Sequence, residues 1–407
     1  MAPPGARSAT TPTLSQLKWV LLLTLLALLW RTITTRSPFF LIPPVPSLKP
    51  PHTCRVYHQP LLSCASFTAL PSSPLLLLSC GELWVFDPTA PETPPRLVVF
   101  TSLDATRDFR LGDVVAVSAA GAGEYRVFAV NHAEGGGRVE VLDLDLDLSS
   151  AEARHVATIR HPAIHSPHGI AALNASAFFY TNDFAFAGSG SGSGRAGVVA
   201  EALTAAPGGS LGLAVLTPEG AEVTTVARLA AAKGVAVDTR GNKVYAVSAV
   251  KGVYAFSYDP ANPALTMSKP EFLRTAVLGE NLVFSEESGE LFLSGGTSLR
   301  GLLGGEEEKV AVEQAGRESI TARLVKDGKP RDFANAGLRR EEWRWESVFA
   351  DDGSFYGDVS TGAVLKAGGA FVATASRQRG VLVCRDVPIR HDDEKLQEEQ
   401  TLGRDEL

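Results

Sequence analysis

The sequence predicts an all-β protein, a six-bladed β-propeller that follows an N-terminal signal-anchor segment. Three observations lead to this prediction. A strand–turn–strand unit recurs six times, the apolar runs between turns are short, and a single longer apolar run lies near the N-terminus. Short apolar runs separated by Gly- and Pro-bearing turns are typical of strands rather than long helices.

Each repeat unit is an apolar strand, a polar or Gly-bearing turn and a second apolar strand. The six units begin at Phe67, Val114, Ile170, Val235, Leu282 and Val348. Alternating stretches between them, such as "RVEVLDLDLDL" and "GVYAFSYDP", supply about four strands per unit. A β-sandwich is the competing fold, but six similar units exceed the seven to nine strands that it needs.

The N-terminal region divides into three predicted parts. Residues 1–18 form a short basic tail, residues 19–30 read "WVLLLTLLALLW", and residues 31–53 form a proline-rich linker. The apolar run is shorter than the roughly 20 residues of a membrane span and suits a signal sequence. No small-x-small cleavage pattern follows, so an uncleaved signal anchor is expected, with cleavage left open. A buried core helix is the alternative.

The propeller is predicted to span residues 54–386, and an acidic tail follows over residues 387–407. The chain finishes with Arg404, Asp405, Glu406 and Leu407. This ending is a close variant of the KDEL retrieval signal, which a receptor reads in the endoplasmic reticulum. We therefore expect a lumenal protein of that compartment, attached to the membrane through its N-terminal segment. Asn174 begins an N-glycosylation sequon that such a location would make usable.

Composition narrows the function classes. The net charge of −7 gives no general attraction for nucleic acid. No phosphate-binding Gly-rich loop, nucleophile elbow or metalloprotease motif is present. The four cysteines suit an oxidising compartment and lack zinc-site spacing. Cys64 and Cys80 are interpreted as buried apolar residues or, alternatively, as a second disulfide.

Two segments outside the repeats are predicted to lie at the surface. Residues 187–195, "AGSGSGSGR", are too rich in Gly and Ser for a blade strand and are expected to form an exposed loop. Residues 297–345 form a charged insertion before the last blade, expected to supply outer strands and surface. The acidic run at residues 143–148 alternates, which favours an exposed strand face over a metal site.

Two stretches, "VFAVNHAEGGGRVEVLDL" and "VATIRHPAIHSPHGIAALNASAFFYTND", resemble the paraoxonase/arylesterase family. The similarity runs along most of the chain from Cys54 to Cys384. The resemblance implies a six-bladed propeller and a calcium-dependent hydrolase of aryl esters, lactones or organophosphates. It also implies that a disulfide between Cys54 and Cys384 joins the first and last strands.

In the family, residues at the leading end of each innermost strand hold calcium on the propeller axis. The pairs that precede the six units here are Ala65-Ser66, Gly112-Asp113, His168-Gly169, Lys233-Gly234, Glu280-Asn281 and Glu346-Ser347. Only Glu280 and Asn281 keep the character of the family's ligands. Calcium takes six to eight oxygen ligands, and an ammonium among them would repel it. We therefore expect the Lys233 charge to replace the ion, paired with Glu280, Asp113 and Glu346.

The family's catalytic pair of histidines is represented by His132 alone, because Gly112 stands where the second histidine is expected. A lysine can stabilise an oxyanion and a histidine can move protons. The candidate catalytic residues are therefore His132, His168, Lys233 and Asp113. A structural remnant is the equally weighted alternative.

Three further polar residues lie within the second of the two quoted stretches. Asp183 is a candidate for the substrate pocket by its match to the family, although an Asp after a strand is also an ordinary turn residue. His161 and His165 are weaker candidates.

The resemblance predicts an arylesterase or lactonase acting on an apolar small molecule. The alternative is a non-hydrolytic propeller, which would be a pseudoenzyme, a ligand-binding or interaction platform, or a metal-free isomerase or cyclase. Fold analogy alone does not select between these two predictions.

Overall fold

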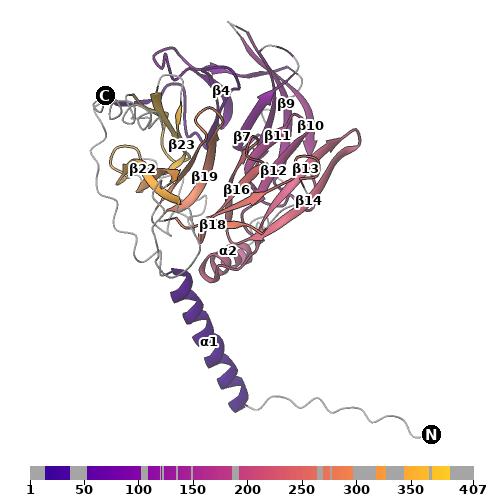
Figure 1. The fold of residues 1–407 in the computed structure, drawn as a ribbon, viewed down its shortest axis with the longest axis vertical. Coiled ribbons are helices and arrows are strands. Elements are labelled where there is room, and N and C mark those ends of the chain that lie inside the picture. The colour runs from indigo at the N-terminus through magenta and orange to yellow at the C-terminus, as the bar shows by residue number, and fades with distance from the viewer. Residues whose placement is uncertain are drawn as a thin grey trace, which may run out of the picture.

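The computed structural model describes thirteen parts of the chain, drawn as ribbons in Figure 1. They are residues 14–36, 53–101, 109–119, 121, 123–133, 136–147, 150–185, 192–263, 269–275, 277–296, 318–326, 343–365 and 369–385. The predicted acidic tail with its RDEL ending, residues 1–13 and most of the proline-rich linker lie outside these residues.

Six separate antiparallel sheets form the domain, which confirms the predicted six blades. The first blade holds β2 (Ser66–Ala69), β3 (Leu76–Cys80), β4 (Glu82–Phe86) and β5 (Arg96–Leu97). The second holds β7 (Leu111–Ser118), β8 (Glu124–Asn131), β9 (Arg138–Leu146) and β10 (Ala151–Ile159), with the short β6 (Val99–Phe100) parallel to β10. The third holds β11 (Pro167–Asn174), β12 (Ala177–Asn182), β13 (Gly209–Thr217) and β14 (Gly220–Leu229).

The remaining blades follow the same order. The fourth holds β15 (Ala232–Asp238), β16 (Lys243–Ser248), β17 (Gly252–Ser257) and β18 (Glu271–Leu273). The fifth holds β19 (Leu278–Ser285), β20 (Glu290–Gly296), β21 (Ser319–Lys326) and β22 (Trp343–Asp351). The sixth holds β23 (Val359–Leu365), β24 (Ala370–Ala375), β25 (Val381–Cys384) and, at its edge, the N-terminal strand β1 (Cys54–Tyr57).

The ring is closed by strands from both ends of the domain. β1 pairs antiparallel with β25, and this register places Cys54 opposite Cys384, which form the predicted disulfide. The innermost strands β2, β7, β11, β15, β19 and β23 contact one another in ring order. Closure therefore gives each innermost strand a packed neighbour on both sides, while each remains the edge strand of its own sheet.

Apolar residues fill the spaces between adjacent blades. One cluster, which includes Val127 and Leu142, packs the first blade against the second. Another, which includes Phe179 and Val244, packs the third against the fourth. Alternation along each strand sends successive side chains toward opposite neighbouring blades, so every blade shares its core with two others.

The predicted start of the sixth blade at Val348 is wrong. Val348 belongs to β22, which is the outermost strand of the fifth blade, and the innermost strand of the sixth blade is β23. The charged insertion does supply outer strands, as expected, because β21 and the start of β22 lie within it. The axial pair of the sixth blade is consequently Ser360-Thr361 rather than Glu346-Ser347.

Two further outcomes concern local structure. The helix α2 (Gly192–Thr204) begins inside the segment that was predicted to be a loop, whose residues 187–191 lie outside the described part. Cys64 and Cys80 form a second disulfide, so the favoured interpretation of two free buried cysteines is wrong.

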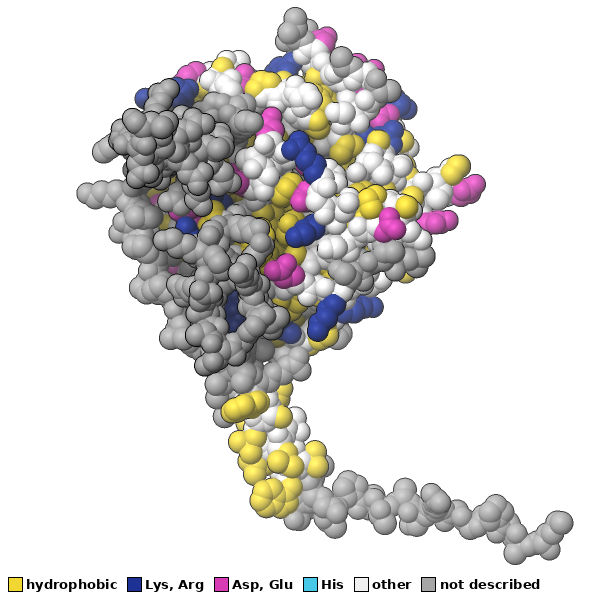
Figure 2. Space-filling model, viewed as in Figure 1, with side chains coloured by type: hydrophobic (Ala, Val, Ile, Leu, Met, Phe, Trp, Pro, Cys, Tyr) yellow, Lys and Arg dark blue, Asp and Glu magenta, His cyan; other side chains and the backbone are white. Residues whose placement is uncertain are grey.

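The predicted anchor segment is helical. Helix α1 (Leu14–Arg36) contains it and projects away from the propeller beside α2 (Figure 1). Its described apolar side chains are exposed, including Trp19 at 62% and Trp30 at 70%, and Figure 2 shows them as a hydrophobic stretch on the stalk. Among the helices in the described residues, none combines the length and apolarity that crossing a membrane requires.

Candidate functional site

The axial residues of five blades sit where the innermost strand departs from regular pairing. The register between the first and second strands shifts at Leu111/Val114, Pro167/Ile170, Ala232/Val235, Gly279/Asn281 and Val359/Thr361. Such bulges re-aim side chains and free backbone groups from the ladder. We call the end at which the innermost strands begin the leading end, and the opposite end the turn end. The bulges gather the axial side chains on the propeller axis at the leading end.

Asp113 is the centre of a buried hydrogen-bond network that joins four blades. Its Oδ1 accepts from Ser66 Oγ, from the Val114 amide at 3.0 Å and from Asn281 Nδ2 at 3.2 Å. Its Oδ2 accepts from the Ile170 amide at 2.9 Å. Burial raises the pKa of this carboxyl, against the lowering effect of these hydrogen bonds. Asp113 therefore acts as a structural hub, and no described contact joins it to Lys233.

The network continues into the sixth blade. Asn281 Nδ2 also donates to Thr361 Oγ1 at 3.0 Å, and its Oδ1 accepts from the Leu282 amide at 2.9 Å. Ser360 Oγ donates to the Ala65 carbonyl at 2.7 Å. Ser360 and Thr361 were missed by the sequence prediction. The available signal was a pair of small polar residues shortly before the apolar residues Ala363, Val364 and Leu365 of β23.

Lys233, Glu280 and His168 form a charged cluster, called the axial triad below. Lys233 Nζ lies 3.4 Å from Glu280 Oε1, and His168 Nε2 lies 3.0 Å from the same oxygen. The Lys233 side chain is 10% exposed and the Glu280 side chain 36% exposed. Burial opposes ionisation of Glu280, but the Lys233 charge and the hydrogen bond and charge of His168 hold its pKa well below the ordinary 4.5. The predicted pairing of Lys233 with Glu280 is thus present in the structure.

His168 has one ring nitrogen committed and one without a described partner. The carboxylate of Glu280 orients Nε2, whereas Nδ1 is buried and makes no hydrogen bond within the described residues. With Nε2 donating to Glu280, the lone pair of the neutral ring is on Nδ1. The ring thus has the carboxylate–imidazole arrangement of a general base.

Close backbone approach fixes the position of Lys233. A Cβ on Gly169 would lie 2.7 Å from the Lys233 carbonyl oxygen, and a Cβ on Gly234 would lie 2.5 Å from Asn281 Cα. Thr181 Oγ1 accepts from the Gly169 amide at 2.9 Å and donates to the Lys233 carbonyl. Only glycine fits at these two contacts, so β11, β15 and β19 hold the triad on closely packed strands.

Helix α2 supports the same region from outside the ring. A small apolar cluster joins Val198 and Ala202 of α2 to Ala230 and Ala231, which directly precede β15. The connection to Lys233 is therefore braced by packing rather than left as an open loop.

His132 lies at the leading end of the second blade and is exposed. A Cβ on Gly112 would meet His132 Nε2 at 2.8 Å, so the ring occupies the space beside the glycine. The preceding Asn131 is buried, and it joins the Arg110 amide to Glu140 through Oδ1 at 2.9 Å and Nδ2 at 2.8 Å. His132 is thus positioned by the end of β8.

Glu140 anchors that arrangement from the second blade. Burial opposes its ionisation, but hydrogen bonds from Thr158, Asn131, Arg138 and His155 together lower its pKa. Arg138 Nε lies 2.6 Å from Glu140 Oε1, and both side chains are almost fully buried. A buried carboxylate with this many donors is a rigid structural element.

The other candidate residues lie apart from the triad or serve locally. Asp183 Oδ1 accepts from the Phe184 amide at 2.8 Å, which is the contact of a turn residue. His161 is exposed, and its Nδ1 accepts from the Ala163 amide at 3.1 Å. Asn174 is exposed at the β11–β12 turn, where its Oδ1 accepts from the Ser176 amide at 2.8 Å. Its position is compatible with a surface modification.

Glu346, predicted to pair with Lys233, lies elsewhere. It is on β22, and its Oε2 is 3.2 Å from Arg323 of the neighbouring strand. The predicted pairing with Lys233 is wrong because Glu346 belongs to the outermost strand of the fifth blade and not to the innermost strand of the sixth.

Within the described residues of the acidic run, 143–147, Asp143 makes cross-strand ion pairs. Asp143 lies 2.6 Å from Arg126 and 2.5 Å from Arg154.

The axial residues do not fit a calcium ion. Calcium needs six to eight oxygens, several of them anionic. Asp113 is already saturated by protein donors, Asn281 turns its Nδ2 donor toward the axis, and the Lys233 ammonium stands beside Glu280. No group of three His, Cys, Asp or Glu side chains within the described residues has an arrangement that could hold a metal.

Comparisons with known proteins assign no family. No protein-family model and no curated protein matches the chain. Among solved structures, a glucose dehydrogenase is similar over 81% of this chain and 98% of its own, at 12% identity and a TM-score of 0.46. A gluconolactonase from Xanthomonas campestris is similar over 84% and 98%, at 11% identity and 0.46. A nidogen/laminin complex is similar over 74% and 89%, at 11% identity and 0.37. At these values the similarities assign no reaction to this chain.

Proposed function

We propose that this protein resembles the paraoxonase/arylesterase family and hydrolyses an ester or lactone of an apolar small molecule without calcium. The observation that carries the proposal is the axial triad. It places a cation, a carboxylate and an oriented imidazole on one point of the axis. These groups are sufficient for base-assisted attack of water on a carbonyl.

Each residue of the triad has a defined role in this proposal. His168 Nδ1 takes the proton of the attacking water while Glu280 stabilises the resulting imidazolium through Nε2. Lys233 Nζ stabilises the negative charge that develops on the carbonyl oxygen, and His168 then returns the proton to the leaving alkoxide. Nδ1 is buried in this structure, so the side chains around it must move before a water or a substrate group can reach it. His132, at the same end of the propeller, would contact the substrate.

A non-hydrolytic role is the second candidate. It is favoured by the distance of 3.4 Å between Lys233 and Glu280, since this pairing already neutralises the lysine charge. A ligand-binding platform, or an isomerase or cyclase that uses the leading end of the channel, requires no stronger electrophile than this paired lysine.

Turnover of phenyl acetate and γ-butyrolactone tests the choice. The full-length protein is assayed with and without EGTA, beside Lys233→Met, His168→Gln and, as a control, the exposed Lys269→Met. The proposal expects turnover that EGTA leaves unchanged and that both triad variants reduce at least tenfold. Turnover abolished by EGTA would instead assign a calcium-dependent hydrolase. No turnover in any condition would favour the non-hydrolytic candidate.

We further propose that the protein resides in the lumen of the endoplasmic reticulum. The RDEL ending, the N-terminal apolar helix and the exposed sequon at Asn174 support this location. The partners would be a retrieval receptor at the C-terminus and the membrane at α1. Protease protection of microsomes, sensitivity to endoglycosidase H and secretion after deletion of residues 404–407 test it. An unglycosylated protein that protease digests in intact microsomes would refute it.

A further inference from the structure

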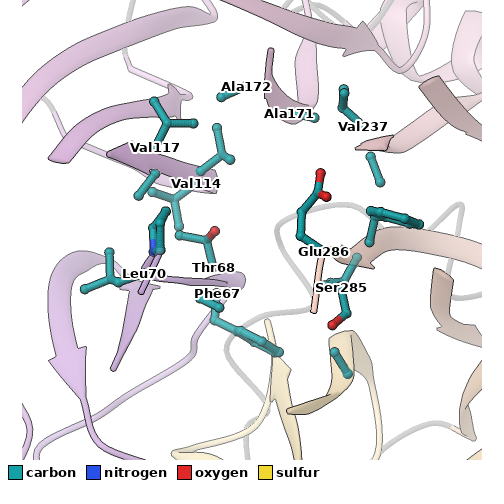
Figure 3. A pocket seen from close by; sticks show the side chains of 18 of the residues that line it. Phe67, Thr68, Leu70, Val114, Val117, Ala171, Ala172, Val237, Ser285 and Glu286 are labelled. Carbon is teal, nitrogen blue, oxygen red and sulfur yellow. The ribbon is translucent and has the colours of Figure 1, made fainter. Parts of the chain in front are cut away.

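A cavity of about 580 Å³ occupies the turn-end half of the central channel (Figure 3). Residues from the innermost strands of all six blades line it. Asp113 and Asn281 are among them, whereas no residue of the axial triad is. The buried hub around Asp113 therefore separates this cavity from the leading-end site, and the two are different places on one axis.

Much of the cavity wall is made of apolar side chains, and several of these are covered by the protein only in part. The half-buried aliphatic members include Val115, Val117, Leu173, Val283 and Leu365, drawn from four blades. Figure 3 shows Val114, Val117, Ala172 and Val237 directed around the same open space. Binding of an apolar molecule is favourable when it displaces water from partly uncovered aliphatic surface inside a concave site.

The mouth at the turn end is polar and exposed. Glu286 Oε1 accepts from the Thr239 amide at 3.1 Å, and Glu286 Oε2 lies 3.5 Å from Arg240. The Arg240 side chain is 74% exposed and that of Glu286 is 39% exposed. A polar group held at this mouth stays in contact with water, whereas a charge carried inward would be desolvated against aliphatic walls.

The extent of the lining favours an elongated molecule. It includes Asp113 and Ser118 of β7, which are five residue steps or about 17 Å of strand apart. The cavity therefore extends along the innermost strands.

We propose that the turn-end channel is a second ligand site, which binds an uncharged, elongated and largely apolar small molecule with its polar end at the Arg240–Glu286 mouth. The site is independent of the proposed hydrolysis, because it lies on the other side of the Asp113 hub. The molecule enters from the turn end and stops at Asp113 and Asn281.

Fluorescence titration with the uncharged probe N-phenyl-1-naphthylamine tests this proposal. The full-length protein is held in dodecyl maltoside, and the signal of detergent alone is subtracted. Val117→Trp fills the channel and Ser285→Trp narrows its mouth. Val156→Trp, on the outer strand β10 where Val156 is 40% exposed, is the matched control.

The wild-type protein and Val156→Trp are expected to show saturable binding. Both channel variants should weaken it at least tenfold while retaining the wild-type melting temperature. If Val117→Trp does not fold, Ser285→Trp alone decides, because it alters only the half-buried mouth. Absence of saturable binding in the wild type, or equal binding in a folded channel variant, would overturn the proposal. Phenyl acetate turnover, measured on the same samples, is expected to be unaffected by the probe.

Discussion

Replacing Lys233 with methionine removes the cation of the axial triad while keeping the length of the side chain. The ammonium lies 3.4 Å from Glu280 Oε1 and is mostly buried, whereas Glu280 is 36% exposed. Loss of the lysine leaves the carboxylate with His168 as its described partner. We expect both Lys233→Met and Glu280→Gln to be destabilising, and Glu280→Gln to be at least as destabilising, because the glutamine leaves the mostly buried Lys233 ammonium without its carboxylate.

The magnitude follows from the burial of the two groups. A hydrogen bond to a charged group contributes about 1.5 to 3 kcal/mol, and exposure of one partner to solvent reduces this. We therefore expect Lys233→Met to cost about 1 to 2 kcal/mol in the free energy of unfolding. For a domain of this size that corresponds to a fall of roughly 2 to 6 °C in melting temperature.

A double-mutant cycle measures the interaction. Urea unfolding at pH 7 is compared for wild type, Lys233→Met, Glu280→Gln and the double variant, with the exposed Lys269→Met as control. The expected coupling is about 1 kcal/mol, so that the double variant is less destabilised than the sum of the single variants. Additive effects, or a stable Lys233→Met protein, would refute the ion pair as a stabilising contact.

Three further predictions address the pH dependence, the disulfides and the second histidine position. The folded state lowers the pKa of Glu280, so its stabilisation is present above the ordinary pKa of 4.5 and is lost as pH falls through the lowered pKa. The difference in the free energy of unfolding between wild type and Glu280→Gln should therefore be constant between about pH 7 and 5 and should become smaller below pH 5. A difference that grows in acid would contradict this prediction. The two disulfides close loops of 330 and 16 residues separation. Loop closure therefore predicts that Cys54→Ser costs about 6 kcal/mol and Cys64→Ser about 3 kcal/mol in the free energy of unfolding, which denaturant unfolding measures. The reverse order would be inconsistent with ring closure. Gly112→Ala places a Cβ 2.8 Å from His132 Nε2 and should displace the imidazole ring. This displacement should lower phenyl acetate turnover while the melting temperature stays within about 3 °C of the wild-type value. Unchanged turnover would show that His132 does not contact the substrate.

The repeat pattern was sufficient to predict the blades, because a strand that packs on both faces leaves an apolar run between turns. It failed at the sixth blade for a physical reason. Val348, Phe349 and Ala350 precede an Asp-Gly turn and read like the start of a hairpin, yet this run ends the outermost strand of the fifth blade. Whether a strand lies on the axis or at the edge depends on tertiary packing, which local alternation does not encode.

The site was predicted in part. Position relative to each strand start placed Lys233, Glu280 and Asp113 near the axis, and the structure brings Lys233 and Glu280 together. The different contacts of Asp113 and His168 were not predictable from the sequence. Asp113 accepts from a backbone amide and His168 contacts Glu280 because register shifts between paired strands create bulges at both positions. Helix α2 was missed because a Gly/Ser-rich run immediately precedes its apolar residues.

Metal content measured together with thermal stability tests whether Lys233, rather than calcium, provides the positive charge on the axis. The full-length protein is equilibrated with calcium, dialysed, and examined by elemental analysis and by melting with and without EGTA, beside Lys233→Asn. We expect less than one calcium per chain and an unchanged melting temperature in EGTA. One calcium per chain, whose removal lowers the melting temperature, would contradict it.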